Sequence, residues 1–92
     1  MLVGKVFDVF EIKGRGVVVA TNTTYEQLPQ DLKFKIGDPV EFRVGEKVVV
    51  RTKIVGIEHS DPWSPRHSFG FLLPRDVNKT DVPIGSEVWS VE

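Results

Sequence analysis

The sequence predicts a single all-β domain over residues 1–92, built as a small closed barrel of about six short strands. The chain of 92 residues is long enough for one core and no more. Runs of β-branched and aromatic residues alternate with glycine, proline and polar turn residues. No window keeps the apolar period of an amphipathic helix.

The first two strands are expected to form a hairpin. Residues 3–12 are rich in valine, phenylalanine and isoleucine, and residues 17–21 form a second apolar run. Between them lies Lys13-Gly14-Arg15-Gly16, whose glycines supply the positive φ of a tight turn. The second run is apolar at nearly every position, so we expect it to be covered on both faces.

A second hairpin is expected in the middle of the chain. Residues 40–44 alternate apolar and charged side chains, which is typical of a strand with one buried face. After a glycine-containing turn, residues 48–57 form its partner. In this partner strand Val50 and Ile54 share one face, and Arg51 and Lys53 share the other.

Two further strands are expected at residues 69–73 and 87–91, each with a proline close to one end. Residues 22–33 and 60–67 are polar, contain proline and are expected to be loops. The first loop is expected to include one helical turn at residues 27–32.

Composition excludes several classes of protein. The 12 lysines and arginines nearly balance the 13 acidic residues, so a strongly basic nucleic-acid binder is not indicated. There is no cysteine, which excludes disulfides and thiolate metal sites. No apolar stretch approaches the roughly 20 residues of a spanning helix, and no secretory signal is recognisable. We therefore expect a cytoplasmic protein with no membrane partner.

No motif for catalysis, nucleotide binding or metal binding is complete. Residues 78–81 match the Asn-Lys-x-Asp string that reads guanine in GTPases, but the phosphate-binding loop is missing, so we expect a polar turn and no bound nucleotide. His59 and His67, with Glu58 and Asp61 nearby, fit no zinc spacing. There is no nucleophile motif. The chain is expected to be no enzyme, with no catalytic residue, metal or cofactor.

Cations and aromatic residues are the candidates for binding. Lys13 and Arg15 flank glycines and would suit a phosphate, or would simply be solvated in a turn. Arg43, Arg51 and Lys53 would line one face of the central hairpin, holding RNA backbone or pairing with the glutamate between the strands. Exposed aromatic residues would stack on bases, whereas buried ones would belong to the core. Trp89 and Phe10 are expected in the core, Trp63 fits either role, and Phe7 and Tyr25 are stacking candidates.

Four parts of the chain together resemble domain 2 of elongation factor Tu and related translational GTPases. Asp8-Val9-Phe10, followed by Gly14-Arg15-Gly16 and a valine run, is similar to the opening of that domain. The similarity continues, in the family's order, through residues 32–42, 55–58, and 69–73 with 81–88. Departures from the family pattern occur at Val17, at Ser60-Asp61 and at Ser68.

The resemblance implies a six-stranded closed antiparallel β-barrel that contacts the 3′ end of aminoacyl-tRNA and ribosomal RNA. It implies that Glu58 packs against the terminal adenosine, that Asp8 and Phe10 lie near the aminoacyl group, and that Leu72 forms an apolar wall. The expected function is a non-catalytic module that binds tRNA or ribosomal RNA. The residues expected to bind RNA are Lys13, Arg15, Arg43, Arg51, Lys53 and Glu58.

The alternative function is a protein-interaction module that holds a partner through the 60–67 loop. The residues expected to contact such a partner are Asp8, Phe10, His59, Trp63, His67 and Leu72.

Overall fold

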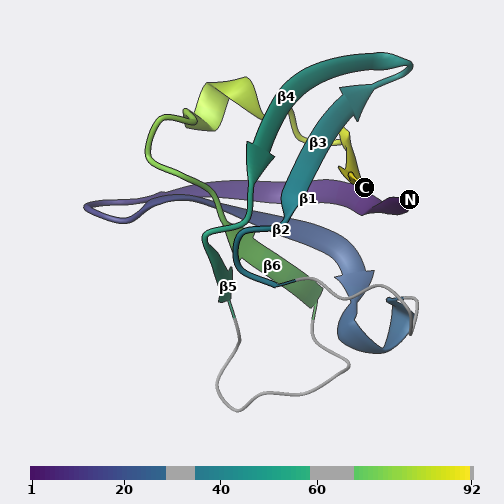
Figure 1. The fold of residues 1–92 in the computed structure, drawn as a ribbon, viewed down its shortest axis with the longest axis horizontal. Helices are drawn as coiled ribbons and strands as arrows, with labels where there is room; N and C mark the ends of the chain where they lie inside the picture. The colour runs from purple at the N-terminus through teal and green to yellow at the C-terminus, as the bar shows by residue number, and fades with distance from the viewer. Residues whose placement is uncertain (29–34, 59–67, 92) are drawn as a thin grey trace.

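Seven antiparallel strands form one strongly curled sheet, accompanied by two short 3₁₀ turns (Figure 1). The computed structural model describes residues 1–28, 35–58 and 68–91. The prediction of an all-β fold is confirmed. Across these ranges, no helix has the length and apolar character needed to cross a membrane.

Every ladder between the strands is antiparallel. They are β1 (Leu2–Ile12), β2 (Gly16–Thr24), β3 (Pro39–Val44), β4 (Lys47–Lys53), β5 (Gly56–Glu58), β6 (Ser68–Leu72) and β7 (Glu87–Ser90). The 3₁₀ turns are η1 (Tyr25–Gln27) and η2 (Lys79–Asp81). In space the order is β4-β3-β7-β1-β2-β6-β5.

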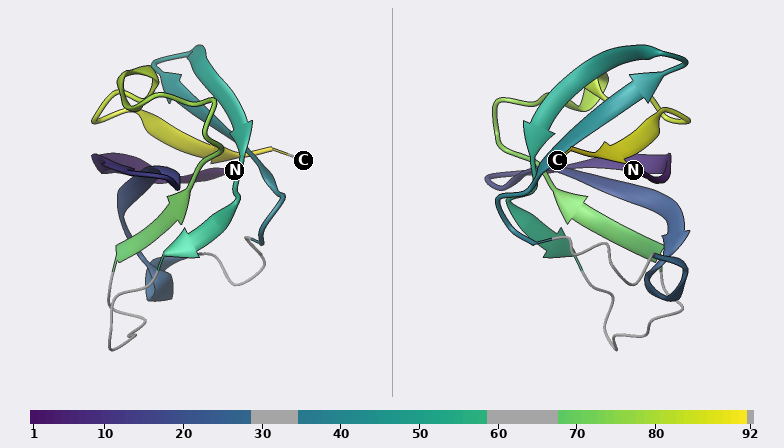
Figure 2. Two further views of the ribbon diagram at one scale, coloured as in Figure 1. Left: turned by 90° about the vertical axis from the view of Figure 1, so that its left-hand side faces the viewer. Right: turned by 45° about the vertical axis from the view of Figure 1, so that its right-hand side comes forward.

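The long strand β1 joins the two halves of the sheet. Its first residues pair with β7, and its residues from Val6 onward pair with β2. Val6 pairs with Thr21 and Asp8 with Ala20, which leaves Phe7 unpaired in a β-bulge. In Figure 2 the half that contains β3, β4 and β7 lies above β1, and the half that contains β2, β5 and β6 lies below it.

The core fills the space between these two halves. It is built from valine, phenylalanine, leucine and isoleucine side chains of both halves. The ring of Phe42 on β3 stacks 6.2 Å from the ring of Phe71 on β6, so this contact bridges the halves directly. Val17, Val18 and Val19 are all buried, as the apolar run predicts, although Val18 points to the outer side of the sheet.

The hydrogen-bonded sheet is not closed, contrary to the barrel that the sequence predicts. Its two edges are β4 and β5, which follow each other in the chain. At the junction, the Ile54 N–H donates to Asp38 O at 2.9 Å beside β3, and the Val55 N–H donates to Leu72 O at 2.9 Å at the end of β6. The predicted strand 48–57 therefore changes partner within two residues and is divided in two. This division raises the strand count from six to seven.

One smaller prediction needs correction. Strand β2 continues to Thr24, beyond the predicted start of the loop at residue 22, and Thr24 pairs with Ser68. A 3₁₀ turn lies at Tyr25–Gln27; of the helical turn predicted at 27–32, residues 29–32 lie outside the described ranges. The 60–67 loop also lies outside them.

The predicted polar turn at residues 78–81 coincides with η2. The Asn78 N–H donates to the Asp81 side chain at 2.9 Å, and the Asp81 N–H donates to Asn78 O at 2.9 Å. The aspartate therefore caps its own turn, which is a structural use of that residue.

Candidate functional site

Two rows of residues cross the outer surface of the half-sheet formed by β1, β2, β6 and β5. The register pairs Val9 with Val19 and Val19 with Phe71, and all three side chains belong to the core. Side chains alternate along a strand, so the neighbouring rows point outward. These rows are Phe10–Val18–Leu72–Gly56 and Asp8–Ala20–Gly70–Glu58. We call these eight residues the apolar face.

Three residues of the apolar face have little or no side chain. A Cβ atom on Gly56 would lie 3.4 Å from Leu72 Cβ, and one on Gly70 would lie 3.3 Å from Val19 O. The third small residue is Ala20. Val18 and Leu72 are each 8% exposed and form an apolar floor between Phe10 and Glu58. Such a floor suits a flat ligand that is partly apolar.

An ion pair borders this floor. Arg15 Nη2 lies 2.7 Å from Glu58 Oε1, and the two side chains are 55% and 30% exposed. Arg15 belongs to the β1–β2 turn and Glu58 to β5, so their side chains reach across β2 and β6. Arg75 donates to Gly14 O in the same turn, and Lys13 is exposed there. This end of the apolar face therefore carries three cations and a carboxylate.

Exposed aromatic rings lie at the β1 side of the apolar face. Phe7, at the bulge, is 69% exposed, and Phe10 is 49% exposed. The prediction that Phe10 belongs to the core is wrong, because the register places it outward beside Val18. The Asp8 carboxylate accepts a hydrogen bond from the Val9 N–H at 2.8 Å, which holds the carboxylate against β1.

A separate charged cluster lies on the outer side of β3, β4 and β7. The buried Glu41 carboxylate accepts hydrogen bonds from Arg43 Nη2 at 2.8 Å and from Arg51 Nε at 2.7 Å. The guanidinium of Arg43 lies 4.3 Å from the ring centre of Trp89. Trp89 is therefore a half-buried platform for a cation on the outer surface, and the prediction that it belongs to the core is wrong.

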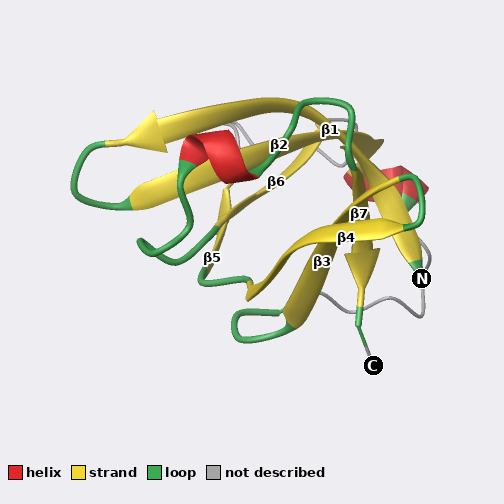
Figure 3. Ribbon diagram, turned by 90° about the horizontal axis from the view of Figure 1, so that it is seen from above, coloured by secondary structure: helices red, strands yellow, loops and turns green. Residues whose placement is uncertain are grey.

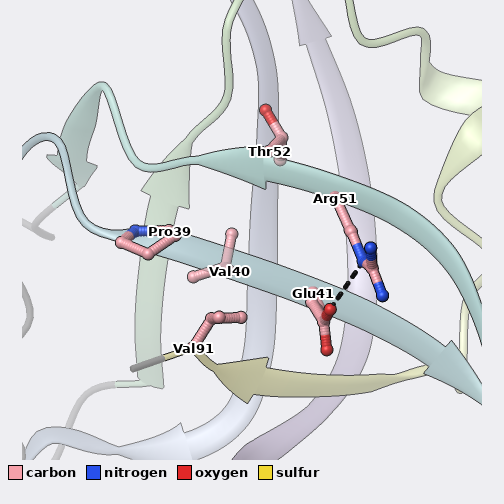
Figure 4. A pocket seen from close by; sticks show the side chains of 6 residues that line it. All are labelled: Pro39, Val40, Glu41, Arg51, Thr52 and Val91. Carbon is pink, nitrogen blue, oxygen red and sulfur yellow. Dashed lines mark hydrogen bonds and ion pairs between the residues drawn. The ribbon is translucent and has the colours of Figure 1, made fainter.

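The Glu41 cluster makes stability depend on pH. Hydrogen bonds from Arg43, and then from Arg51, lower the pKa of Glu41 below its ordinary value of 4.5. A lowered folded-state pKa stabilises the protein fully above the unfolded value, and this contribution disappears as pH falls through the folded value. Figure 4 shows Glu41 and Arg51 joined at the edge of a pocket of about 330 Å³, which Pro39, Val40, Thr52 and Val91 also line.

We expect the substitution Glu41→Gln to destabilise the protein at neutral pH and much less in acid. The stability difference from the wild type should be constant above pH 4.5 and shrink below it. Urea unfolding between pH 7 and pH 3 measures this difference, with Glu46→Gln in the adjacent turn as the control for loss of one negative charge. A difference for Glu41→Gln that stays constant down to pH 3 would contradict the expectation.

The residues that the sequence singled out fall into two groups. The register places Asp8, Phe10, Leu72 and Glu58 together on the apolar face, with Lys13 and Arg15 at its end. The second group, Arg43, Arg51 and Lys53, lies on the central hairpin of the other half-sheet.

The two groups of cations belong to different half-sheets. In Figures 1 and 3 the β1–β2 turn projects to the left, and the tip of the β3–β4 hairpin lies at the upper right or right of the molecule. His59, Trp63 and His67 lie outside the described ranges. Gly56 and Gly70 were not among the predicted site residues because their places on the apolar face follow from strand register, and Arg75 was not because its contact with Gly14 depends on the folded turn. No family model, curated protein or solved structure matches this chain.

Proposed function

We propose that the chain is a non-catalytic module, similar to domain 2 of translational GTPases, that binds the 3′ end of a tRNA on the apolar face. The observation that supports this proposal most is the register of β1, β6 and β5. Asp8 and Phe10 come from β1, Leu72 from β6 and Glu58 from β5, yet all four share one face. These are the four residues that the family resemblance assigns to the end of an aminoacyl-tRNA.

The chemistry of the apolar face suits a terminal nucleoside. A base is flat and has apolar faces, and Val18 and Leu72, with the small residues beside them, would contact it. Phe10 and Phe7 offer exposed rings for stacking. The Glu58 carboxylate accepts hydrogen bonds and would receive them from ribose hydroxyls. The cations at the end of the face would contact the neighbouring phosphates.

The sheet is also compatible with the six-stranded barrel that the family resemblance implies. If β4 and β5 are counted as one bent strand, the sheet has six strands and its two edges meet within a single segment of the chain. The half-sheets enclose a shared core, as the halves of a barrel do.

The test is tRNA binding measured by fluorescence anisotropy at 50 and 200 mM salt. Aminoacyl-tRNA, deacylated tRNA and tRNA that lacks the terminal adenosine are compared. Removal of the adenosine should weaken binding about tenfold, since stacking contributes about 1–3 kcal/mol per base. Binding should also weaken with salt, because each phosphate contact adds about −0.7 to the slope of log K against log salt.

Two variants connect the binding to the apolar face. Ala20→Leu raises the floor and should weaken binding of intact tRNA to the level of the truncated tRNA. Lys53→Ala, on the other half-sheet, is the control and should leave binding within a factor of about two, as one distant charge contributes little. Absence of tRNA binding at 50 mM salt, or equal binding of intact and truncated tRNA, would overturn the proposal.

A further inference from the structure

Strand β4 has a free edge. It pairs with β3 on one side, and no strand in the described part of the chain pairs with its other side. In an antiparallel ladder, successive residues turn their backbone groups alternately toward and away from the partner. The Ile54 N–H donates to Asp38 O, so Ile54 and Thr52 face β3, while Arg51 and Lys53 face away.

Just after β4, at Val55, the same side of the backbone pairs with the end of β6. Val55 continues the alternation of Arg51 and Lys53, and its N–H donates to Leu72 O at 2.9 Å. The backbone at the outer edge of β4 is therefore oriented for pairing with another strand. No bond to a described residue uses the outward N–H and C=O groups of Arg51 and Lys53.

The side chains along this edge are predominantly cationic. The alternating exposed positions of β4 hold Lys47, Val49, Arg51 and Lys53. Arg51 is 75% exposed and uses its Nε atom for Glu41, while Lys47 and Lys53 form no ion pair with a described residue. A shallow hollow of about 370 Å³ lies along β4 and is lined by Val48, Val49, Val50 and Arg51. The edge thus combines unpaired backbone, positive charge and a shallow hollow.

Charge decides which occupant fits this edge. A second copy of the chain, paired antiparallel about Thr52, would place Arg51 opposite Lys53 twice, and like charges directly opposite are destabilising. A strand with acidic side chains at alternate positions would instead face each cation with a carboxylate. We propose that the free edge of β4 binds an extended acidic segment of a partner protein, which adds an eighth strand to the sheet.

The test uses a synthetic eight-residue peptide that alternates glutamate with valine or threonine, and its counterpart with lysine in place of glutamate. Binding to the full chain is followed by NMR titration at low salt. The glutamate peptide should bind at least about tenfold more tightly than the lysine peptide, since each opposite-charge cross-strand pair contributes about 0.2–1 kcal/mol. Amide exchange should slow at Arg51 and Lys53, whose N–H groups would be covered.

Two substitutions at one position separate backbone pairing from charge. Lys53→Thr keeps the outward N–H and removes one charge, so binding should weaken about threefold. Lys53→Pro also removes the N–H, at an edge position where proline is tolerated, and binding should weaken at least about tenfold. The double substitution Lys47→Glu with Lys53→Glu should reverse the preference between the two peptides.

Several results would overturn this proposal. They are equal binding of the two peptides, Lys53→Pro binding as tightly as Lys53→Thr, or chemical shift changes centred on Phe10 and Leu72. Sedimentation that shows a dimer of the wild type but not of Lys53→Pro would assign the edge to a second copy of the chain. The tRNA proposal is tested with a different ligand and with the Ala20→Leu variant of the apolar face, so its failure is distinguishable from these outcomes.

Discussion

Replacing Phe71 by alanine is expected to lower the free energy of unfolding by about 3–5 kcal/mol. The ring of Phe71 is fully buried; it stacks 6.2 Å from the ring of Phe42 across the two half-sheets and lies tilted 5.5 Å from the ring of Phe69. Its removal leaves a cavity at the contact that joins the halves. A domain of this size has a total stability of about 5–14 kcal/mol, so the variant should lose a large part of it.

Urea unfolding followed by circular dichroism measures this loss. The control is Ile84→Ala, which removes an apolar side chain that is 66% exposed and should change stability by no more than about 0.5 kcal/mol. Phe71→Leu should fall between the two because it refills part of the cavity. A loss below about 1 kcal/mol for Phe71→Ala would mean that the half-sheets do not pack through this ring.

The sequence was sufficient to predict elements whose side-chain alternation is regular. Residues 40–44 alternate without interruption, so their strand and the buried positions of Val40 and Phe42 were predictable, whereas Val44 at its end is 50% exposed. The prediction for Phe10 was wrong because of the bulge at Phe7. That bulge inserts one residue between the inward-facing Val6 and Val9, so the alternation counted from Val6 is displaced by one. No residue in that stretch marks a bulge, because phenylalanine is equally suited to a regular strand.

The open edge of the sheet was also not predictable from the local sequence pattern. Residues 48–57 form one continuous extended run, and the change of partner at Ile54 and Val55 depends on where β3 and β6 lie in space. A hydrophobic pattern fixes which face of a strand is buried but not which strand lies beside it. The six strands inferred from the sequence therefore became seven.

The sequence was sufficient to predict which residues could bind a ligand, but not which of them share a surface. Arg51 was a candidate for RNA backbone and for a pair with Glu41, and only the folded structure brings it to 2.7 Å from Glu41. The partners Arg15 and Glu58 lie 43 residues apart, and three strands in register are needed to bring them together. Glycine has no functional group, so the places of the two glycines on the apolar face were evident only from the strand register.

Replacing Gly16 by alanine is the other change with a large expected effect. Gly16 begins β2, its φ is +127°, and an added Cβ would lie 2.8 Å from Leu73 O. A side chain there combines a backbone strain of about 1–3 kcal/mol with a forced shift of β6 that costs a similar amount. We expect Gly16→Ala to lower the free energy of unfolding by about 2–5 kcal/mol.

The matched control for Gly16→Ala lies two residues away in the same turn. Gly14 also has a positive φ, of 80°, but an added Cβ would meet nothing within 4 Å, so Gly14→Ala should cost only about 1–2 kcal/mol. The two variants share the backbone effect and differ in the contact with Leu73. Amide exchange at Leu73, whose N–H donates to Val17 O at 2.8 Å, should accelerate in Gly16→Ala and remain slow in Gly14→Ala. Equal losses of stability in the two variants would contradict the close approach of β2 to the end of β6.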